Sequence, residues 1–396
     1  MHKLIYFGLL VVFFSACKKD PVITDNADLP YLVFSEEVVA QPVIHNNEFR
    51  VLSNNEEGLH LIKIDTDGNK TELCALEPVL TENNVINYSD ITLLSSSDNG
   101  NFIVFSYYTY TETDSVATVG LLKTDSTGNL LWQNTAEIQV IGASQLPFNN
   151  AFPTADGGLA LFFAQERGPI TKNFNVKISL FDANGINTQN SISEPFAGSI
   201  SSIFMDSNQK VFVFPTSENT QPRNGQSDLT TYILDKNASL TGSKILPISV
   251  SDISAIYELG DNYLLTGISV LLPGEQTGSA SLLDSDFNLL FTSSFSTTFA
   301  YYSFTKTDSH YITTGAYSSQ ARTQEWSSLY EETGNTAAWA FIDETGQVES
   351  DRKVYSEFST IAVSCIAKSD TELYVLAVRK SFSTYNDLIF INTSIN

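Results

Sequence analysis

The sequence predicts an all-β protein folded as a single β-propeller, and two repeated patterns support this prediction. The first pattern is a run of alternating apolar residues, an Asp-led turn and a further strand, recurring roughly every 50 to 60 residues. Its copies are LIKIDTDGN (61–69), GLLKTDSTGNLLW (120–132), KISLFDANG (177–185), TTYILDKNA (230–238), SASLLDSDFN (279–288), AWAFIDETG (338–346) and LIFINTSIN (388–396). A repeat of this length built only of strands indicates a radial or solenoid array.

The second pattern is a tight polar turn followed by a strand, placed before each apolar run. Asn, Asp and Gly in these turns supply the positive φ that a two-residue hairpin needs. The turns lie at 46–47, 98–100, 156–158, 206–208, 260–262, 307–309 and 369–370. The strands after them are rich in β-branched and aromatic residues, as in VFVF (211–214), and no long segment beyond the first residues has helical spacing.

Each repeat therefore predicts four antiparallel strands, which is the composition of a propeller blade. We expect about seven blades, with six or eight as alternatives. The last repeat lacks a fourth strand, and a spare strand, YLVFSEEV (31–38), precedes the first repeat. We expect residues 31–38 to complete the last blade, because this closes the ring and removes an exposed sheet edge.

The first residues predict a signal peptide. A short basic start (MHK) is followed by an apolar run at 4–14, too short to span a bilayer, and then by FSAC at 14–17. This resembles a bacterial lipoprotein signal, whose last cysteine is lipidated and becomes the first residue of the mature chain. The resemblance implies a signal peptide over 1–16, an acyl anchor such as palmitate on Cys17, a polar tether over 17–29 and a propeller over 30–396. An uncleaved anchor helix with an incidental cysteine is the alternative.

Two further resemblances concern the location and the family. The Lys18-Lys19-Asp20 sequence resembles the start of mature lipoproteins of the Bacteroidetes, and no aspartate follows Cys17 directly. This implies an outer-membrane lipoprotein, facing either the periplasm or the outside. The DGG turn at 156–158 and the phrase KTDSTGNLLW at 123–132 resemble those of surface β-propeller repeat proteins of the same group. That resemblance implies the fold and the cell envelope but no particular activity.

The phrase that ends at Trp132 also resembles the Asp-x-x-Gly-x-x-x-Trp repeat of quinoprotein-type propellers and of the propeller lipoprotein of outer-membrane-protein assembly. In those families the tryptophan docks one blade on the next. The resemblance implies the same for Trp132. The other repeats lack a matching tryptophan, so no quinone-binding residues are carried over.

Composition narrows the possible partners. The net charge is −24 with the acidic residues scattered, which repels phosphate backbones and argues against nucleic acid as a partner.

Beyond Cys17, the chain holds Cys74, expected on an outer strand, and Cys365, expected on an inner strand. We expect no disulfide between them, and a monomeric propeller.

Residue patterns for catalysis or metal binding are weak. His45, His60 and His310 lack the spacing of metal ligands, and no nucleophile elbow or phosphate loop occurs in the sequence. Segment 65–72 resembles a calcium loop, but its glycine comes too early for an EF-hand. We therefore expect no cofactor, no metal site and no catalytic residue.

Loop lengths indicate which face of the ring is functional. Connections between strands one and two, and three and four, are tight, whereas those on the opposite face are long, such as 106–115, 216–228 and 317–336. Functional loops gather on one side of a rigid scaffold, and aromatic and Arg side chains are common contact residues. The binding candidates on these loops are Tyr107, Tyr108, Tyr110, Arg167, Arg223, Trp326, Tyr330, Arg379 and Tyr385. Each of them could instead pack on a neighbouring blade.

Three functions remain open. The favoured one is a non-catalytic cell-envelope lipoprotein that binds a glycan or a protein through its long-loop face. The first alternative is a carbohydrate-active hydrolase or lyase, with polar residues such as Asp90, Asn150 and Asp252 around the channel mouth. Such an enzyme needs two carboxylates about 5–10 Å apart in a concave pocket. The second alternative is a structural subunit of an outer-membrane complex.

Overall fold

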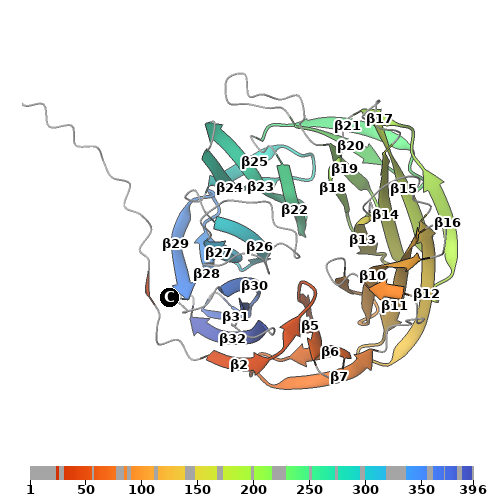
Figure 1. Ribbon diagram of the computed structural model, residues 1–396. Helices are drawn as coiled ribbons and strands as arrows, with labels where there is room; N and C mark the ends of the chain where they lie inside the picture. Colours follow the sequence, from red (N-terminus) through yellow and green to blue (C-terminus); the bar gives the residue numbers. More distant parts are fainter. Residues whose placement is uncertain are drawn as a thin grey trace, which may run out of the picture.

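The computed structural model shows a ring of seven β-sheets (Figure 1). The structure describes residues 24–25, 31–55, 58–76, 84–86, 91–110, 115–138, 148–166, 173–197, 200–215, 229–248, 252–272, 275–294, 299–317, 336–354, 360–369, 371–380 and 386–394. These residues form strands and their connections, and no helix occurs among them. The prediction of an all-β, seven-bladed propeller is confirmed.

Each blade contains four main strands, and blades 1, 2, 3 and 6 each add a short extra one. Blade 1 is β3 (Glu37–Val38), β4 (Val43–His45), β5 (Glu48–Asn55), β6 (Gly58–Ile64) and β7 (Lys70–Leu76). Blade 2 is β8 (Asn84–Ile86), β9 (Thr92–Ser95), β10 (Asn101–Tyr110), β11 (Ser115–Thr124) and β12 (Leu130–Ile138). Blade 3 is β13 (Phe148–Pro153), β14 (Leu159–Glu166), β15 (Asn173–Phe181), β16 (Asn187–Ile192) and β17 (Phe196–Ala197).

Blades 4, 5 and 6 follow chain order, whereas the outer strand of blade 7 comes from the N-terminal segment. Blade 4 is β18 (Ile200–Met205), β19 (Val211–Pro215), β20 (Leu229–Leu234) and β21 (Leu240–Leu246). Blade 5 is β22 (Asp252–Leu259), β23 (Asn262–Leu272), β24 (Glu275–Leu283) and β25 (Leu289–Ser294). Blade 6 is β26 (Phe299–Lys306), β27 (Tyr311–Tyr317), β28 (Thr336–Ile342) and β29 (Val348–Val354). Blade 7 is β30 (Thr360–Ala367), β31 (Glu372–Lys380), β32 (Asn386–Ser394) and β2 (Tyr31–Ser35).

The N-terminal strand closes the ring. β2 pairs antiparallel with β32, with Tyr31 opposite Ile391, so the predicted closure is confirmed. The predicted strand 31–38 is nevertheless split, because its last two residues form β3 and pair with β5 of blade 1. Between the two strands, Glu36 is buried and bonded to Lys70 at the start of β7, which draws the chain into blade 1. One segment therefore ties the last blade to the first.

A two-residue strand also lies within the predicted tether. β1 (Thr24–Asp25) pairs in parallel with β29, opposite Arg352 and Lys353, at the outer edge of blade 6. Cys17 and the predicted cleavage position lie outside the described residues. The domain boundaries there stay predictions. Among the described residues, no helix is long and apolar enough to cross a membrane.

Six Asp-led turns share one geometry. In each turn, a carboxylate oxygen of the aspartate accepts backbone N–H bonds from the second and fourth residues after it, as in Asp125 with Thr127 and Asn129 (both 2.9 Å). The aspartates are Asp65, Asp125, Asp182, Asp235, Asp284 and Asp343. These side chains replace backbone partners in the turn, which is how Asp favours turns. The repeats predicted from sequence are therefore structural equivalents.

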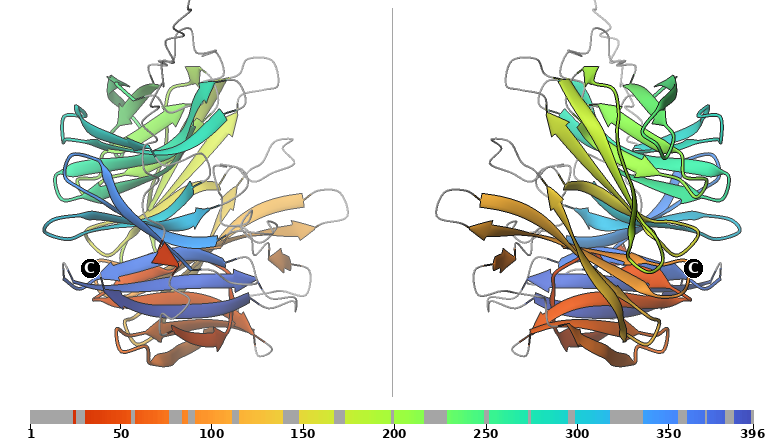
Figure 2. Two further views of the ribbon diagram at one scale, coloured as in Figure 1. Left: turned by 90° about the vertical axis from the view of Figure 1, so that its left-hand side faces the viewer. Right: turned by 90° about the vertical axis from the view of Figure 1, so that its right-hand side faces the viewer.

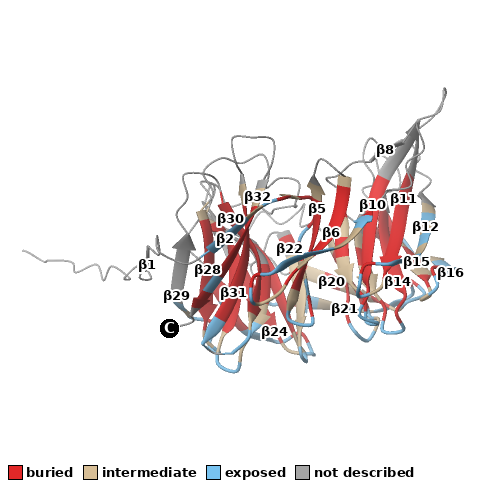
Figure 3. Ribbon diagram, turned by 90° about the horizontal axis from the view of Figure 1, so that it is seen from below, coloured by how far each residue is buried: buried red, intermediate tan, exposed pale blue. Residues whose placement is uncertain are grey.

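The hydrophobic core is divided among the spaces between blades. The middle strands of the blades are the most buried and the outer strands the most exposed, as Figure 3 shows, and the inner strand β30 is also buried along almost its whole length. Cys365 lies on β30 and is fully buried, whereas Cys74 lies half-buried on the outer strand β7, and both thiols are free. Burial raises the pKa of Cys365 to about 12 and that of Cys74 to about 11. The predicted inner and outer positions are confirmed, and burial rather than a disulfide holds the fold together.

Candidate binding site

Few of the predicted contact residues lie within the described part of the chain. Tyr107, Tyr108, Tyr110 and Arg379 do, on strands β10 and β31. The candidates outside the described residues are Arg167, Arg223, Trp326, Tyr330 and Tyr385. The described candidates belong to blades 2 and 7, which blade 1 separates, so the structure does not bring them together.

The three tyrosines lie on a strand, not in a loop as predicted. β10 continues through Tyr110 and pairs with β11 up to Tyr110 opposite Ser115. On its other side, β10 pairs with β8, with Tyr107 opposite Ile86 and Tyr108 opposite Val85. Blade 2 therefore extends beyond its neighbours on one side of the ring (Figure 2). The polar, Thr-rich sequence indicated a loop, but pairing on both sides extended the strand.

Arg379 is neutralised within its own blade. Its Nε and Nη2 atoms donate to Oδ2 of Asp387, at 3.1 and 2.6 Å, across the pair of strands β31 and β32. Both side chains are mostly buried, with 23% and 17% exposed. Arg379 is therefore a structural ion pair beside the ring closure rather than a free cation for a ligand.

Of the residues proposed for the channel mouth, only Asn150 has a described side chain. Asn150 donates its side-chain amide to the carbonyl of Ile203 in blade 4, at 2.5 Å, and so joins two inner strands. Asp252 begins β22, and Asp90 lies outside the described residues. Within the described ranges, no group of three or more His, Cys, Asp or Glu side chains is placed to hold a metal ion. The calcium-like loop is an ordinary turn, because Asp65 accepts hydrogen bonds from Asp67 and Asn69.

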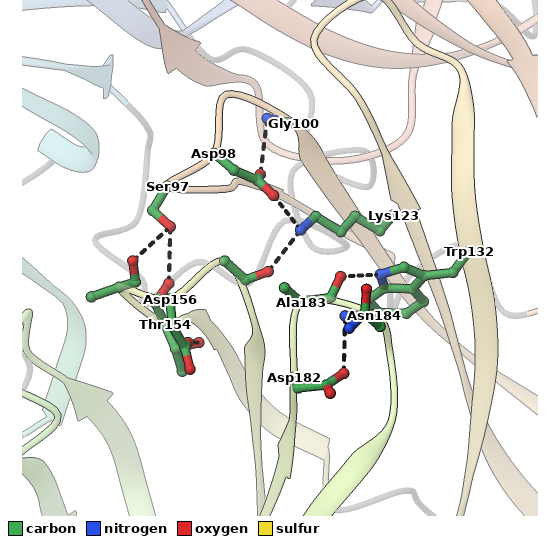
Figure 4. Close-up of polar contacts among 12 residues, drawn as sticks. Ser97, Asp98, Gly100, Lys123, Trp132, Thr154, Asp156, Asp182, Ala183 and Asn184 are labelled. Atoms are coloured by element: carbon green, nitrogen blue, oxygen red, sulfur yellow. Dashed lines mark hydrogen bonds and ion pairs between the residues drawn. The ribbon is translucent and has the colours of Figure 1, made fainter.

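The tight turns lie along the face of the ring opposite the long-loop face, where the exposed turns gather in Figure 3. The contact between blades 2 and 3 on this face is shown in Figure 4. Lys123 is 1% exposed, and its ammonium group donates to Asp98 (2.5 Å) and to the carbonyl of Gly157 (2.7 Å) in the next blade. A buried charge is tolerated only when it is paired in this way.

Trp132 docks blade 2 on blade 3. Its indole Nε1 donates to the carbonyl of Ala183 at 2.8 Å (Figure 4), and its ring packs against Phe102 with centroids 5.9 Å apart. A Cβ at Gly185 would lie 2.6 Å from the indole, so only glycine allows this contact. The docking role that the resemblance implied for Trp132 is therefore present in the structure.

The same two positions meet at the other blade contacts. By strand register, Gln189, Gly242 and Phe291 are equivalent to Trp132. Gln189 donates to the carbonyl of Lys236 at 3.2 Å, and Phe291 packs where a Cβ at Gly346 would lie 2.5 Å away. Phe291 thus faces a glycine in the next turn as Trp132 does, whereas the turn beyond Gln189 carries Ala238.

Between blades 4 and 5 this size relation is reversed. The outer strand carries Gly242, and the next turn carries Phe287 in the place of the glycine, with φ of +61°. A left-handed conformation costs a residue with a side chain about 1–2 kcal/mol. The Phe287 ring packs on Phe212, with centroids 4.9 Å apart. Phe212 is the equivalent of Phe102. Phe287 therefore covers Phe212 from the next blade, whereas Trp132 covers Phe102 from the same blade.

The reversal leaves a pocket of about 650 Å³ between the two blades. A Cβ at Gly242 would meet no atom within 4 Å, so the space where the tryptophan would lie is open. The pocket is lined by Asn208, Gln209, Lys210, Phe212, Ile233, Leu234, Asp235, Lys236, Thr241, Lys244, Tyr263, Ser285, Asp286 and Phe287. The sequence patterns did not predict this pocket. Its signal was visible in the repeats, where SDFN stands in the place of STGN.

Buried contacts hold the floor of this pocket rigid. The Tyr263 hydroxyl donates to Asp206 in blade 4 at 3.0 Å, and Asp206 is 2% exposed. Burial, together with the Asp206 carboxylate, raises the pKa of Tyr263 well above its ordinary value. The Tyr263 and Phe287 rings stack with centroids 4.9 Å apart. Ser207 is bonded to Glu258 across the same contact, at 2.6 and 2.8 Å.

These features define the chain as a seven-bladed β-propeller with an open contact between blades 4 and 5. No protein-family model matches the chain, and no curated protein matches its sequence. Among solved structures it is similar to a protein of unknown function from Bacteroides caccae, at 10% identity and a TM-score of 0.41, over 66% of this chain and 84% of that one. It is also similar to a variant of Synechocystis apocarotenoid oxygenase, at 11% identity and a TM-score of 0.45, over 79% of this chain and 71% of that one. Similarities of this size do not bear on function.

Proposed function

We propose that this protein is a lipid-anchored β-propeller of the cell envelope that binds a glycan or a protein without catalysing a reaction. The observation that carries the proposal is the difference between the two faces. On one face, the strands are joined by short Asp-led turns that hydrogen bonds to the aspartate stabilise, as at Asp125 and Asp343. On the opposite face, the ends of the strands are joined by long segments, such as 216–228 and 318–335. A rigid scaffold with variable loops on one side is the usual arrangement of binding propellers and sandwiches.

Trp326 and Tyr330 are the first candidates for contact, because they belong to the longest of these segments. Large aromatic residues with few rotatable bonds are enriched among the residues that dominate binding energy. Tyr107, Tyr108 and Tyr110 would border the same face from the extended blade 2. Arg379 contributes no net charge to it, because of the pairing with Asp387.

The envelope location rests on the first twenty residues. Their likeness to lipoprotein signals of the Bacteroidetes supports acylation of Cys17 and attachment to the outer membrane. We expect membrane-purified protein to begin at Cys17 and to carry more than one acyl chain, since a single chain binds a bilayer only weakly. Mass spectrometry of the native N-terminus tests this. An unmodified Cys17 in that protein would contradict the proposed anchoring, and the Cys17→Ala variant should be released from the membrane.

Binding is tested by capture from detergent-solubilised outer membranes, together with a glycan array, using the acylated protein. We expect Trp326→Ala and Tyr330→Ala each to weaken the interaction by about tenfold or more, the effect of losing a buried aromatic anchor. Ile192→Ala is a matched control, because Ile192 is an apolar side chain 59% exposed on an outer strand. Hydrolysis of a polysaccharide by the purified protein, lost with one carboxylate substitution, would support the enzyme alternative instead.

A further inference from the structure

The pocket between blades 4 and 5 opens on the tight-turn face. At two other blade contacts, Trp132 and Phe291 fill the corresponding space against a glycine. Here Gly242 leaves the space empty. Phe287 lies on the inner side of this space, and its backbone has a left-handed conformation that residues with a side chain seldom adopt. Backbone strain of this kind persists where the surrounding structure imposes it, and it is common at ligand sites.

The lining carries three lysines against two aspartates, Asp235 and Asp286, although the protein as a whole is acidic. Lys210, Lys236 and Lys244 border the pocket, while the whole chain has 21 Lys and Arg residues against 45 Asp and Glu. In the described part of the chain, none of the three lysines forms an ion pair with a carboxylate. Lys244 instead donates to the backbone carbonyl of Asp286 and lies over the Phe287 ring, 5.7 Å from its centroid. Three ammonium groups therefore border the pocket without a carboxylate at ion-pair distance, and they exceed the two carboxylates of the lining by one charge.

Neutral polar groups alternate with the lysines. The side-chain amides of Asn208 and Gln209 and the hydroxyl of Ser285 line the pocket and make no hydrogen bond within the described residues. Thr241 donates its hydroxyl to the carbonyl of Ile233 at 3.0 Å, which leaves the oxygen free to accept. The apolar wall is formed by Phe287 and Ile233. Such a wall with several donors and acceptors around it suits a ring that carries hydroxyl groups.

We propose that this pocket binds one anionic sugar unit of a glycan, a hexuronate or a sulfated hexose. The lysines pair with the carboxylate or sulfate, the amides and hydroxyls bind the sugar hydroxyls, and the apolar wall contacts the pyranose ring. Densely charged polyanions are disfavoured, because the net charge of −24 repels them beyond the pocket. The site lies opposite the long-loop face, so its success or failure is independent of the binding function proposed above.

The test is calorimetric titration of the full chain with three probes: trigalacturonate, a sulfated trisaccharide and neutral maltotriose. We expect a charged probe to bind, the neutral one to bind at least about tenfold more weakly, and added salt to weaken binding. Lys244→Gln and Lys236→Gln should each weaken binding by about tenfold. Lys306→Gln, at the groove between blades 6 and 7 on the same face, is the matched control and should leave the affinity unchanged.

A second variant closes the pocket without removing a charge. Gly242→Trp combined with Phe287→Gly restores the arrangement of Trp132 and Gly185 at this contact. We expect the double variant to fold and to lose binding of the charged probe. The proposal is overturned if neither charged probe binds, if Lys306→Gln weakens binding as much as Lys244→Gln does, or if the folded double variant binds like the natural protein. Selective loss in the lysine variants and in the double variant supports it, and comparison of the two charged probes distinguishes uronate from sulfate.

Discussion

The third residue after each turn aspartate decides how closely two blades approach. It has positive φ in all six turns, at Gly68, Gly128, Gly185, Ala238, Phe287 and Gly346. Glycine adopts this conformation without steric cost. At Gly185, Gly128 and Gly346 the missing side chain also makes room for a residue of the preceding blade, namely Trp132, Leu73 and Phe291. The glycine therefore serves both the turn and the packing between blades.

This account predicts opposite outcomes for two glycines. Gly185→Ala should destabilise the protein by about 2 kcal/mol or more, because the left-handed backbone is strained and the new methyl group overlaps Trp132. Gly242→Ala should change the free energy of unfolding by less than about 0.5 kcal/mol, because the space beside it is open. Denaturant unfolding of both variants measures the difference, and equal losses would show that the contact between blades is not the cause.

The turn aspartates also predict a dependence on acid. Hydrogen bonds from the side chains of Asn129 and Thr127 lower the pKa of Asp125 to about 2. A carboxylate with a lowered folded-state pKa stabilises the fold above its unfolded pKa and loses that contribution as pH falls through the folded value. The stability difference between the natural protein and Asp125→Asn should therefore shrink between about pH 4 and pH 2. Asp67→Asn is the control, since the Asp67 carboxylate accepts no hydrogen bond from the described residues; an equal pH response in both variants would contradict the account.

At the scale of elements, the closing strand joins the two ends of the ring. β2 covers the edge of β32, and Val38 of β3 lies in one core cluster with Leu388 and Phe390. A protein that begins at Glu37 should therefore expose the edge of β32, unfold at a lower temperature and associate. A protein that begins at Pro30 loses only β1 and should keep the melting temperature and the monomeric state of the mature chain. Thermal unfolding and size-exclusion chromatography test the pair, and identical behaviour would show that β2 is dispensable for closure.

The fold could be read from the sequence because each blade repeats local signals. Alternating apolar residues mark the strands, and Asp with Gly marks the turns, as in the turn from Asp125 to Gly128. What could not be read depends on contacts between distant segments. Tyr107 and Tyr108 belong to a strand because β8 pairs with them, and Arg379 is neutralised by a residue of the following strand. The pocket at Gly242 required a comparison of one repeat with the next across a blade contact.

At the scale of the whole molecule, the three tryptophans of the chain have three different positions. Trp339 is fully buried in the core cluster between blades 6 and 7, and Trp132 docks blade 2 on blade 3. Trp326 belongs to the long segment 318–335, which joins β27 to β28 and lies outside the described residues. If the ring is a rigid scaffold for binding, stability and binding should depend on different tryptophans.

The most direct measurement is to determine affinity and melting temperature together for Trp326→Ala and Trp132→Ala, with the partner or glycan found by capture. We expect Trp326→Ala to weaken binding by about tenfold or more and to leave the melting temperature unchanged. Trp132→Ala should lower the free energy of unfolding by about 3 kcal/mol, because it loses the packing on Phe102 and the bond to Ala183, and should leave the affinity of the folded protein unchanged. Full binding by Trp326→Ala, or an equal loss of stability in both variants, would contradict binding through the long-loop face.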